Sequence, residues 1–371
     1  MREMVGTPRI IKLLNKDVIE EIIKFNGPIT KPEISKLTNL SLVTVNKTVE
    51  ILVLEKKVKA SGINPSTGGR RAQFFEINGE LNYNIGLYYY KDVFIGAISN
   101  SIGEITYEEE FSVRVDSYDG VMEDIYHAID SLIKRCETHN ITAIGIGVPG
   151  VVQDGFITNV PNIASWEKIN VASIIEDKYK ITVLLENDIN LATMGVYYSD
   201  YKEKLDSLVL IYLEQGIGSG IILNKELFKG ATNYAGELSN IPVRSSITVD
   251  NKKTKYKGNF ENKISFINDE LVSDRCNNYD ELKSILISTI IDGLLSIICI
   301  LNPEIIIIIH DQLSEDDMNK MEKVIASTIN EENTPQIVKI NDLRKYGIQG
   351  VINMCIRETL PIYSLSSRKR G

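Results

Sequence analysis

Short runs of β-branched and aliphatic residues alternate with helical stretches over most of this chain of 371 residues. Strands that are apolar at nearly every position are buried on both faces, so a sheet built from them needs helices on both sides. The alternation therefore predicts an α/β body from about residue 81 onward. The expected strands lie at 141–148, 181–185, 207–213 and 304–309, and the expected helices near 121–138, 168–179, 189–200 and 280–301.

The first eighty residues follow a different pattern, with three short helices. Apolar residues recur at helical spacing over 10–25. Thr30 followed by Glu33 forms a capping box that predicts a second helix, and Ser41 predicts the start of a third one after a short turn. Two short helices joined by such a turn indicate a helix-turn-helix, whose second helix can enter a major groove of DNA.

The polar residues at the start of the third helix could reach base edges and phosphates, and the basic turn that follows could contact a minor groove. That turn joins two expected strands between residues 57 and 77 and forms a wing. Three-helix modules also mediate protein contacts, and surface arginines are common, but the order of capped helices and basic wing favours DNA binding. The candidate DNA-binding residues are Ser41, Thr44, Asn46, Lys47, Arg70 and Arg71.

Charge and cysteine content narrow the classes of function. Residues 1–80 carry a net charge of +4 and the remaining residues −13, so a basic head precedes an acidic body. The four cysteines are far apart and form no CxxC pair, which disfavours disulfides and structural zinc. We find no signal peptide, and the most apolar run, 294–309, is too interrupted to span a bilayer. These features predict a cytoplasmic protein.

Several glycine- and asparagine-containing motifs occur in a characteristic order. They are Gly145–Gly150, Asn159–Asn162, Glu186–Asn190, Gln215–Gly220 and Ala235–Asn240. In this order and spacing the chain resembles the ROK family (repressors, open reading frames and kinases), and in particular its repressor branch of xylose- and N-acetylglucosamine-repressor type. The resemblance implies a winged helix-turn-helix at residues 1–80, followed at 81–371 by a two-lobed actin-like, sugar-kinase fold that binds sugar and mediates oligomerisation.

The residues that would contact a nucleotide in ROK kinases are altered in this sequence. A DxGGT-like turn is replaced by Leu87–Lys91, and the Gly-Gly after a later strand by His310-Asp311. A GTGIG motif is replaced by Glu214–Gly218, which loses the hydroxyl and adds a carboxylate that would repel a triphosphate. Backbone N–H groups wrap a phosphate only where side chains leave room, so we expect the three tyrosines of the first turn to fill that space. The changes predict that the protein is not an enzyme and has no catalytic residues or cofactor.

The residues that would contact a sugar are better retained. By position in the family's motifs, the candidate sugar-binding residues are Asn162, Asn187, Asp188, Glu237, Asn240 and Glu261. Paired acceptors on several edges suit a polyhydroxylated ring. Each acid could instead be a solvated surface group, most plausibly Glu261, whose alignment is loose. The family's zinc-binding histidine and cysteines are absent, so we expect no metal.

Three hypotheses follow from these residues. The first is a sugar-responsive repressor that assembles at least as a dimer, as a homodimer or a homotetramer. Its expected partners are operator DNA and a monosaccharide effector, and no membrane association is expected. The second is an ATP-dependent ROK sugar kinase with an appended DNA-binding head, in which Asp188 would be the general base. The third is a constitutive DNA-binding protein whose body serves only for assembly.

Overall fold

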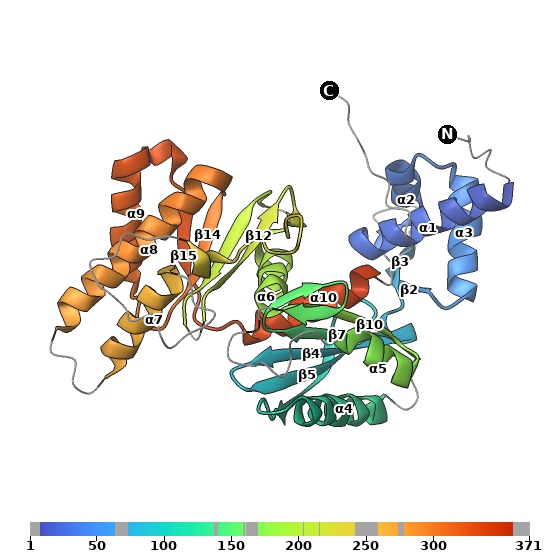
Figure 1. The fold of residues 1–371 in the computed structure, drawn as a ribbon. Coiled ribbons are helices and arrows are strands. Elements are labelled where there is room, and N and C mark those ends of the chain that lie inside the picture. The colour runs from blue at the N-terminus through green and yellow to red at the C-terminus, as the bar shows by residue number, and fades with distance from the viewer. Residues whose placement is uncertain are drawn as a thin grey trace.

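The computed structural model describes residues 8–63, 73–136, 140–158, 160, 170–202, 204–214, 216–241, 259–273 and 278–358. Figure 1 shows three parts: a small N-terminal head, a first lobe built around strands β4–β10, and a second lobe built around β11–β15. The expected α/β body with two lobes is confirmed. Helices α6 (Asp188–Val196) and α10 (Arg344–Glu358) pack against each other between the two sheets.

The head contains three helices and a small antiparallel sheet. The helices are α1 (Pro8–Asn26), α2 (Lys31–Thr38) and α3 (Leu42–Leu54), and the strands β1 (Ile29–Thr30), β2 (Val58–Ile63) and β3 (Gln73–Ile77) pair in the order β1-β3-β2. The reciprocal capping box of Thr30 and Glu33 opens α2. The chain then bends by 117° into α3, an angle within the range of helix-turn-helix motifs.

The sequence of α3 predicts a buried face made of Val45, Val49, Leu52 and Val53, and the structure agrees with this prediction only in part. Val45, Val49 and Leu52 are fully buried and pack in the core of the head. Val53, expected on the same face, is 39% exposed. It follows Leu52 by one residue, about 100° around the helix, and so leaves the core-facing stripe.

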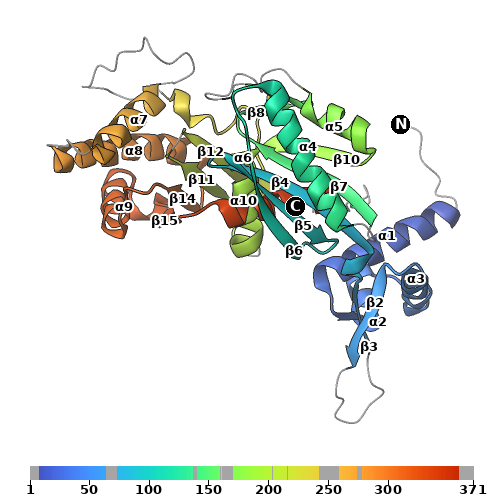
Figure 2. The same cartoon turned by 90° about the horizontal axis from the view of Figure 1, so that it is seen from below.

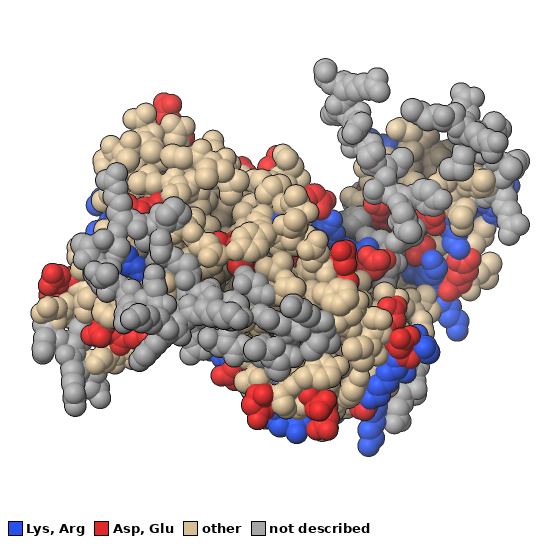
Figure 3. Space-filling view, viewed as in Figure 1, with Lys and Arg blue, Asp and Glu red and all other residues tan. Residues whose placement is uncertain are grey.

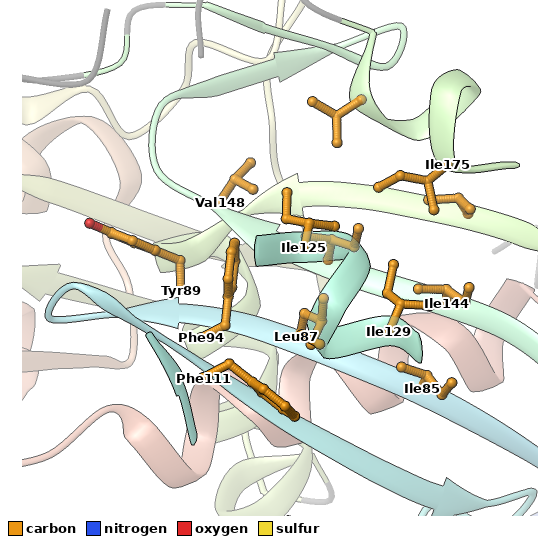
Figure 4. Packing of buried hydrophobic residues seen from close by; sticks show 14 of the residues in the cluster. Ile85, Leu87, Tyr89, Phe94, Phe111, Ile125, Ile129, Ile144, Val148 and Ile175 are labelled. Carbon is orange, nitrogen blue, oxygen red and sulfur yellow. The ribbon is translucent and has the colours of Figure 1, made fainter. Parts of the chain in front are cut away.

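The first lobe is a five-stranded sheet in the order β10-β7-β4-β5-β6. Its helices α4 and α5 cover the face turned toward the viewer in Figure 2, and buried aliphatic and aromatic side chains fill the space between α4 and the sheet (Figure 4). The opposite face packs against α10 and α6. The elements are β4 (Asn82–Tyr90), β5 (Val93–Asn100), β6 (Ile105–Ser112), α4 (Tyr118–Arg135), β7 (Asn140–Val148), the hairpin β8 (Val151–Gln153) and β9 (Phe156–Thr158), α5 (Val171–Tyr179) and β10 (Thr182–Asn187).

The second lobe repeats this layered arrangement with strand order β13-β12-β11-β14-β15. Alternate isoleucines of β14 face α6 on one side and α7–α9 on the other, which explains the unbroken isoleucine run. The elements are β11 (Leu208–Tyr212), β12 (Gly218–Leu223), β13 (Glu226–Leu227), α7 (Asn259–Val272), α8 (Tyr279–Leu301), β14 (Ile305–Ile309), α9 (Glu315–Ile329) and β15 (Gln336–Lys339).

Short helical turns complete the fold: η1 (Gly79–Leu81) between the head and β4, the π-helical turn η3 (Tyr197–Tyr201) after α6, and η4 (Leu238–Asn240) and η6 (Glu331–Asn333) in the second lobe. Among the described residues, α8 is the one unbroken helix long and apolar enough to cross a membrane. Core helices of globular proteins pass the same test, and α8 packs in the core of the second lobe.

Candidate functional site

A cleft of about 440 Å³ opens between the two lobes. Parallel strands β10 and β11 both end beside it, and the ends of parallel strands are where ligands bind in open α/β sheets. The first lobe contributes the β4–β5 turn, and the second lobe contributes the segment after β11 and part of α7. The lining residues are Tyr88, Tyr89, Tyr90, Lys91, Asp92, Val115, Pro149, Asp188, Ile189, Tyr212, Glu214, Gly216, Ser265, Asn268, Asp269 and Leu343.

Asp188 lies on this cleft at the first residue of α6. Its Oδ1 accepts hydrogen bonds from the backbone N–H of Ile189 at 2.8 Å and from the Asn187 amide at 3.1 Å. Burial raises the pKa of Asp188 from 3.8 to about 7, and the neighbouring carboxylate of Glu237 adds to this effect. Asp188 is therefore an acid that changes charge near neutral pH and can accept or donate a hydrogen bond to a ligand hydroxyl.

Asn187 is mainly a structural residue. Its Oδ1 caps α6 by accepting from the backbone N–H of Asn190 at 2.9 Å. Its amide donates to the carbonyl of Gly150 at 2.9 Å as well as to Asp188. Both amide hydrogens are thus engaged within the protein, and Asn187 fixes the position of Asp188 while offering a ligand only the remaining lone pair of its oxygen.

Two further carboxyl groups approach Asp188 from the second lobe. Glu237 immediately precedes η4, and burial raises its pKa to about 7, with the charge of Glu261 contributing. Glu261 lies in the first turn of α7 and is only 4% exposed. The alternative that Glu261 is a solvated surface group is thereby excluded by its burial. Three elements thus bring three of the candidate sugar-binding acids together.

Two candidate sugar-binding residues remain, Asn240 and Asn162. Asn240 is exposed, and its amide donates to the hydroxyl groups of Tyr234 at 2.8 Å and Ser239 at 3.1 Å. Its donors are therefore used within its own turn. Asn162 lies outside the described residues, as does the segment 242–258 in which the family's zinc cysteines would fall. Among the residues that the structure does describe, no cluster of three or more His, Cys, Asp or Glu could hold a metal ion.

The three tyrosines of the β4–β5 turn all line the cleft, but their rings point to different faces of the sheet. Successive strand residues point to opposite faces of a sheet, so Tyr88 and Tyr90 stack on one face with ring centroids 6.2 Å apart. Tyr88 is 1% exposed and packs in the core formed with α6 and α10. Tyr89 lies on the other face, toward α4 (Figure 4), where its hydroxyl donates to Asp92 at 2.8 Å.

Lys91 at the tip of this turn spans the cleft. Lys91 and Asp92 both have positive φ values, 46° and 65°, a conformation that usually requires Gly or Asn. The Lys91 ammonium lies 3.5 Å from Glu214, which belongs to the second lobe and is largely buried. Burial and the neighbouring Asp311 carboxyl raise the pKa of Glu214, and Tyr212 donates to it at 3.3 Å.

His310 lies behind the cleft lining, where its ring contacts Asn268, a residue that lines the cleft. Its Nδ1 accepts from the backbone N–H of Gln312 at 3.0 Å, so the neutral ring carries its proton on Nε2 and donates to Asn268 at 2.9 Å. Burial lowers the pKa of His310 to about 4. Asn268 in turn donates to the carbonyl of Leu213 at 3.1 Å. The altered residues on the nucleotide side therefore form one connected set of contacts.

An ion pair that the sequence does not predict joins Glu186, close to Asp188 in the chain, to Lys229. Glu186 is 7% exposed, and its carboxylate accepts from the Asn187 backbone N–H, the Asn190 amide and Lys229, which lies 2.9 Å away in the second lobe. Glu186 stands in one of the motifs quoted above, and Lys229 lies between two of them. Their 43-residue separation gave no signal that they meet.

In the head, the exposed start of α3 carries the candidate DNA-binding residues that the structure describes. Ser41 caps α3, and its hydroxyl pairs with that of Thr44 at 2.9 Å. Lys47 is exposed and Asn46 half-buried. Figure 3 shows basic and acidic side chains interspersed on the visible face of the head. Arg70 and Arg71 lie outside the described residues.

Two exposed apolar side chains at the start of α3 were missed. Leu42 is 47% exposed and Val43 is 64% exposed. Apolar side chains on a recognition helix can contact thymine methyl groups. The helical period places Val43 outside the buried stripe, whereas Leu42, three and seven residues before Val45 and Val49, lies on the same side as the stripe but in the first turn of the helix.

Fold and cleft together define a class: a two-lobed actin-like α/β body preceded by a helix-turn-helix head. Residues 91–254 match the family model described as the ROK family, so this segment is similar to the domain of that family. The chain is 28% identical over 244 residues to the xylose repressor of Caldicellulosiruptor bescii, which covers 64% of the chain and 61% of that protein.

Other relatives agree with this assignment. The xylose repressor of Bacillus subtilis (strain 168) is 28% identical, covering 62% of the chain and 61% of the relative. The transcriptional dual regulator NagC of Escherichia coli (strain K12) is 24% identical, covering 64% of the chain and 60% of the relative. The chain thus spans about three fifths of the length of these curated relatives.

Solved structures share the fold. A ROK family transcriptional regulator, a homologue of the Escherichia coli MLC protein, superposes with a TM-score of 0.69 at 17% identity and covers 94% of this chain and 99% of its own. A ROK family glucokinase from Streptomyces griseus, solved with glucose and AMPPNP, has a TM-score of 0.57 at 19% identity and covers 73% and 98%. The regulator therefore matches the head as well as the body.

Proposed function

We propose that this chain is a sugar-responsive transcriptional regulator, a repressor that binds operator DNA through its head and a monosaccharide in the cleft between its lobes. The observation that carries the proposal is the asymmetry of the cleft. Asp188 lines the cleft with the charge of Glu237 near it and that of Glu261 near Glu237. Elsewhere on the cleft, Lys91 and Glu214 pair across the two lobes. The names of the curated relatives, xylose repressor and NagC, support the same function.

Under this proposal residues 1–80 are the DNA-binding domain and residues 81–371 the sugar-binding and oligomerisation domain of a cytoplasmic homodimer or homotetramer. Two heads would occupy a pseudo-palindromic operator with half-sites about one helical turn, or a multiple of it, apart. A sugar that binds one lobe arrangement more tightly than the other would change the relation of the two heads. Such coupling is typically worth about 1–3 kcal/mol, or roughly 5–150-fold in operator affinity.

The test is a titration of fluorescently labelled DNA from upstream of the chain's own coding region. Operator binding is measured by anisotropy with pentoses, hexoses, amino sugars, their phosphates, and ATP with Mg²⁺. We expect at least one unphosphorylated sugar to weaken binding, because the acids in the cleft disfavour a phosphate. If no sugar changes either DNA affinity or the melting temperature, the proposal is wrong.

One observation favours a second function, that of an ATP-dependent sugar kinase. Asp188 has a pKa near 7 and lies on the cleft, which suits a general base that accepts a hydroxyl proton. Phosphoryl transfer also needs the phosphates and a metal ion held in line, and Glu214 and Asp311 would repel them. ADP release with the same sugar panel, abolished by Asp188→Asn, would establish the kinase instead.

A further inference from the structure

Residues 228–237, called the strap here, leave β13 of the second lobe and reach across to the first lobe. Two side chains of the strap contact that lobe. The Lys229 ammonium lies 2.9 Å from Oε2 of Glu186 at the end of β10. The Asn233 amide donates to the carbonyl of Val152 in β8 at 2.7 Å. The strap is therefore attached to the first lobe at two separate points.

Both ends of the strap are also fixed to the second lobe. Phe228 donates its backbone N–H to Ile221 at 2.7 Å. At the other end, the backbone N–H and the hydroxyl of Ser219 both donate to the carbonyl of Gly236, at 3.0 and 2.9 Å. Gly236 has a φ of +97°, and a Cβ there would lie 2.1 Å from the Ser219 carbonyl oxygen, so only glycine allows this approach. Glu237 directly follows this fixed point.

The ion pair between Lys229 and Glu186 affects both the strap and the residues that hold Asp188. Glu186 is a buried carboxylate directly before Asn187 and Asp188, and Lys229 is the one cation that the described part of the chain places on it. Removing one partner of a buried ion pair leaves an uncompensated charge, which is strongly unfavourable. Loss of Lys229 would therefore release the strap and also disturb the junction that holds Asp188.

We infer that Lys229 and Asn233 are positioning residues, which hold the strap against the first lobe so that Glu237 faces Asp188 across the sugar site. The inference rests on the proposed function for its sugar-binding consequence, but not for the attachment itself. Neither residue needs to touch the ligand. Closure of the lobes on a sugar would then require both attachments, and an open form would break them.

The attachment is tested first without ligand, by hydrogen–deuterium exchange of the full-length protein. The N–H of Ala235 donates to Lys229 and that of Leu238 to Gly236, so strap amides report its order. We expect Lys229→Met and Asn233→Ala each to raise exchange over residues 229–238 at least tenfold, and Lys229→Arg to restore protection. The matched control is Lys225→Met, because Lys225 pairs with Asp206 within the second lobe at 3.2 Å. Unchanged exchange in both strap variants would overturn the inference.

A double variant guards against misfolding caused by the unpaired Glu186. Lys229→Met combined with Glu186→Gln removes both charges of the pair. We expect the first lobe of this double variant to fold and the hydrogen exchange of the strap to stay high. Restored protection would instead show that the strap does not depend on the ion pair. Calorimetry with the sugar found for the wild type should then show 10–100-fold weaker binding for Lys229→Met and recovery for Lys229→Arg. If the wild type binds no sugar, the proposed function fails, whereas the exchange result still decides whether the strap is held.

Discussion

Replacing Asp188 by asparagine should stabilise the protein at alkaline pH and remove its sugar binding. In the folded state the pKa of Asp188 is raised to about 7 from the ordinary value of 3.8. Between these values the folded protein binds more protons at this site than the unfolded chain, so its stability falls as pH rises from about 4 to about 7. Above pH 7 the buried charge is a constant cost, which the neutral amide avoids.

The size of the effect follows from the same two values. At about 1.4 kcal/mol for each pH unit between them, the upper bound is roughly 4 kcal/mol. Asp188 is largely buried but keeps some exposure to the solvent of the cleft, so roughly half of this should be realised. Loss of a negative charge in the first turn of α6 costs roughly 0.5 kcal/mol in return. We therefore expect Asp188→Asn to gain about 1.5 kcal/mol more in unfolding free energy at pH 8.5 than at pH 4.5.

The assay is urea unfolding followed by circular dichroism at both pH values, with Asp269→Asn as the matched control. Asp269 lines the same cleft but is exposed, so its replacement should give no pH-dependent gain. The asparagine at 188 keeps an oxygen that can accept from the Ile189 N–H, which preserves the start of α6. A stability change that is equal at the two pH values would refute the reasoning, because Asp188 would then be solvated.

Three other substitutions test separate parts of the structure. Gly350→Ala should lower the unfolding free energy by about 1–3 kcal/mol, because its Cβ would lie 1.8 Å from a backbone oxygen of α6; exposed Lys345→Ala in the same helix should stay within about 0.5 kcal/mol. Lys91→Met should lower the unfolding free energy by less than about 1 kcal/mol at pH 8, because Lys91 is 45% exposed. In a Glu214→Gln background the same substitution should leave the unfolding free energy unchanged. Lys47→Gln should weaken operator binding and reduce the slope of log affinity against log salt by about 1, with an unchanged melting temperature.

Local signals predicted the head and most of the helices and strands. The capping box at Thr30 and the cap at Ser41 are short-range interactions between residues three apart, so the sequence alone contains them. The buried strands were recognisable because every residue of a run such as β14 is apolar. The helix α10 was not predicted, although Ile348, Val351, Ile352, Cys355 and Ile356 recur in it at helical spacing. Its glycines, Gly347 and Gly350, are poor helix formers and weaken the local signal.

The geometry of the cleft depended on contacts that sequence spacing does not contain. The resemblance placed Asp188 and Glu237 by motif, but the burial of Glu261 comes from the packing of α7 against η4. The alternation of Tyr88, Tyr89 and Tyr90 between the two faces of the sheet follows from strand geometry alone, so the sequence already contains it. The pairing of Lys91 with Glu214 depends on how the two lobes approach each other, which no local pattern fixes.

The cost of the acidic end of the cleft bears on the hypothesis that the body serves only for assembly. Asp188 and Glu237 both have pKa values raised to about 7, and Glu261 is buried beside them. Neighbouring carboxyl groups in a partly desolvated site destabilise the fold at neutral pH, and neutral side chains of similar size would avoid this. An oligomerisation body gains nothing from such a cluster, because the acids are largely buried within the chain. A ligand with several hydroxyl groups, by contrast, can donate to each carboxyl and offset the cost when it binds, which favours a sugar receptor over a passive scaffold.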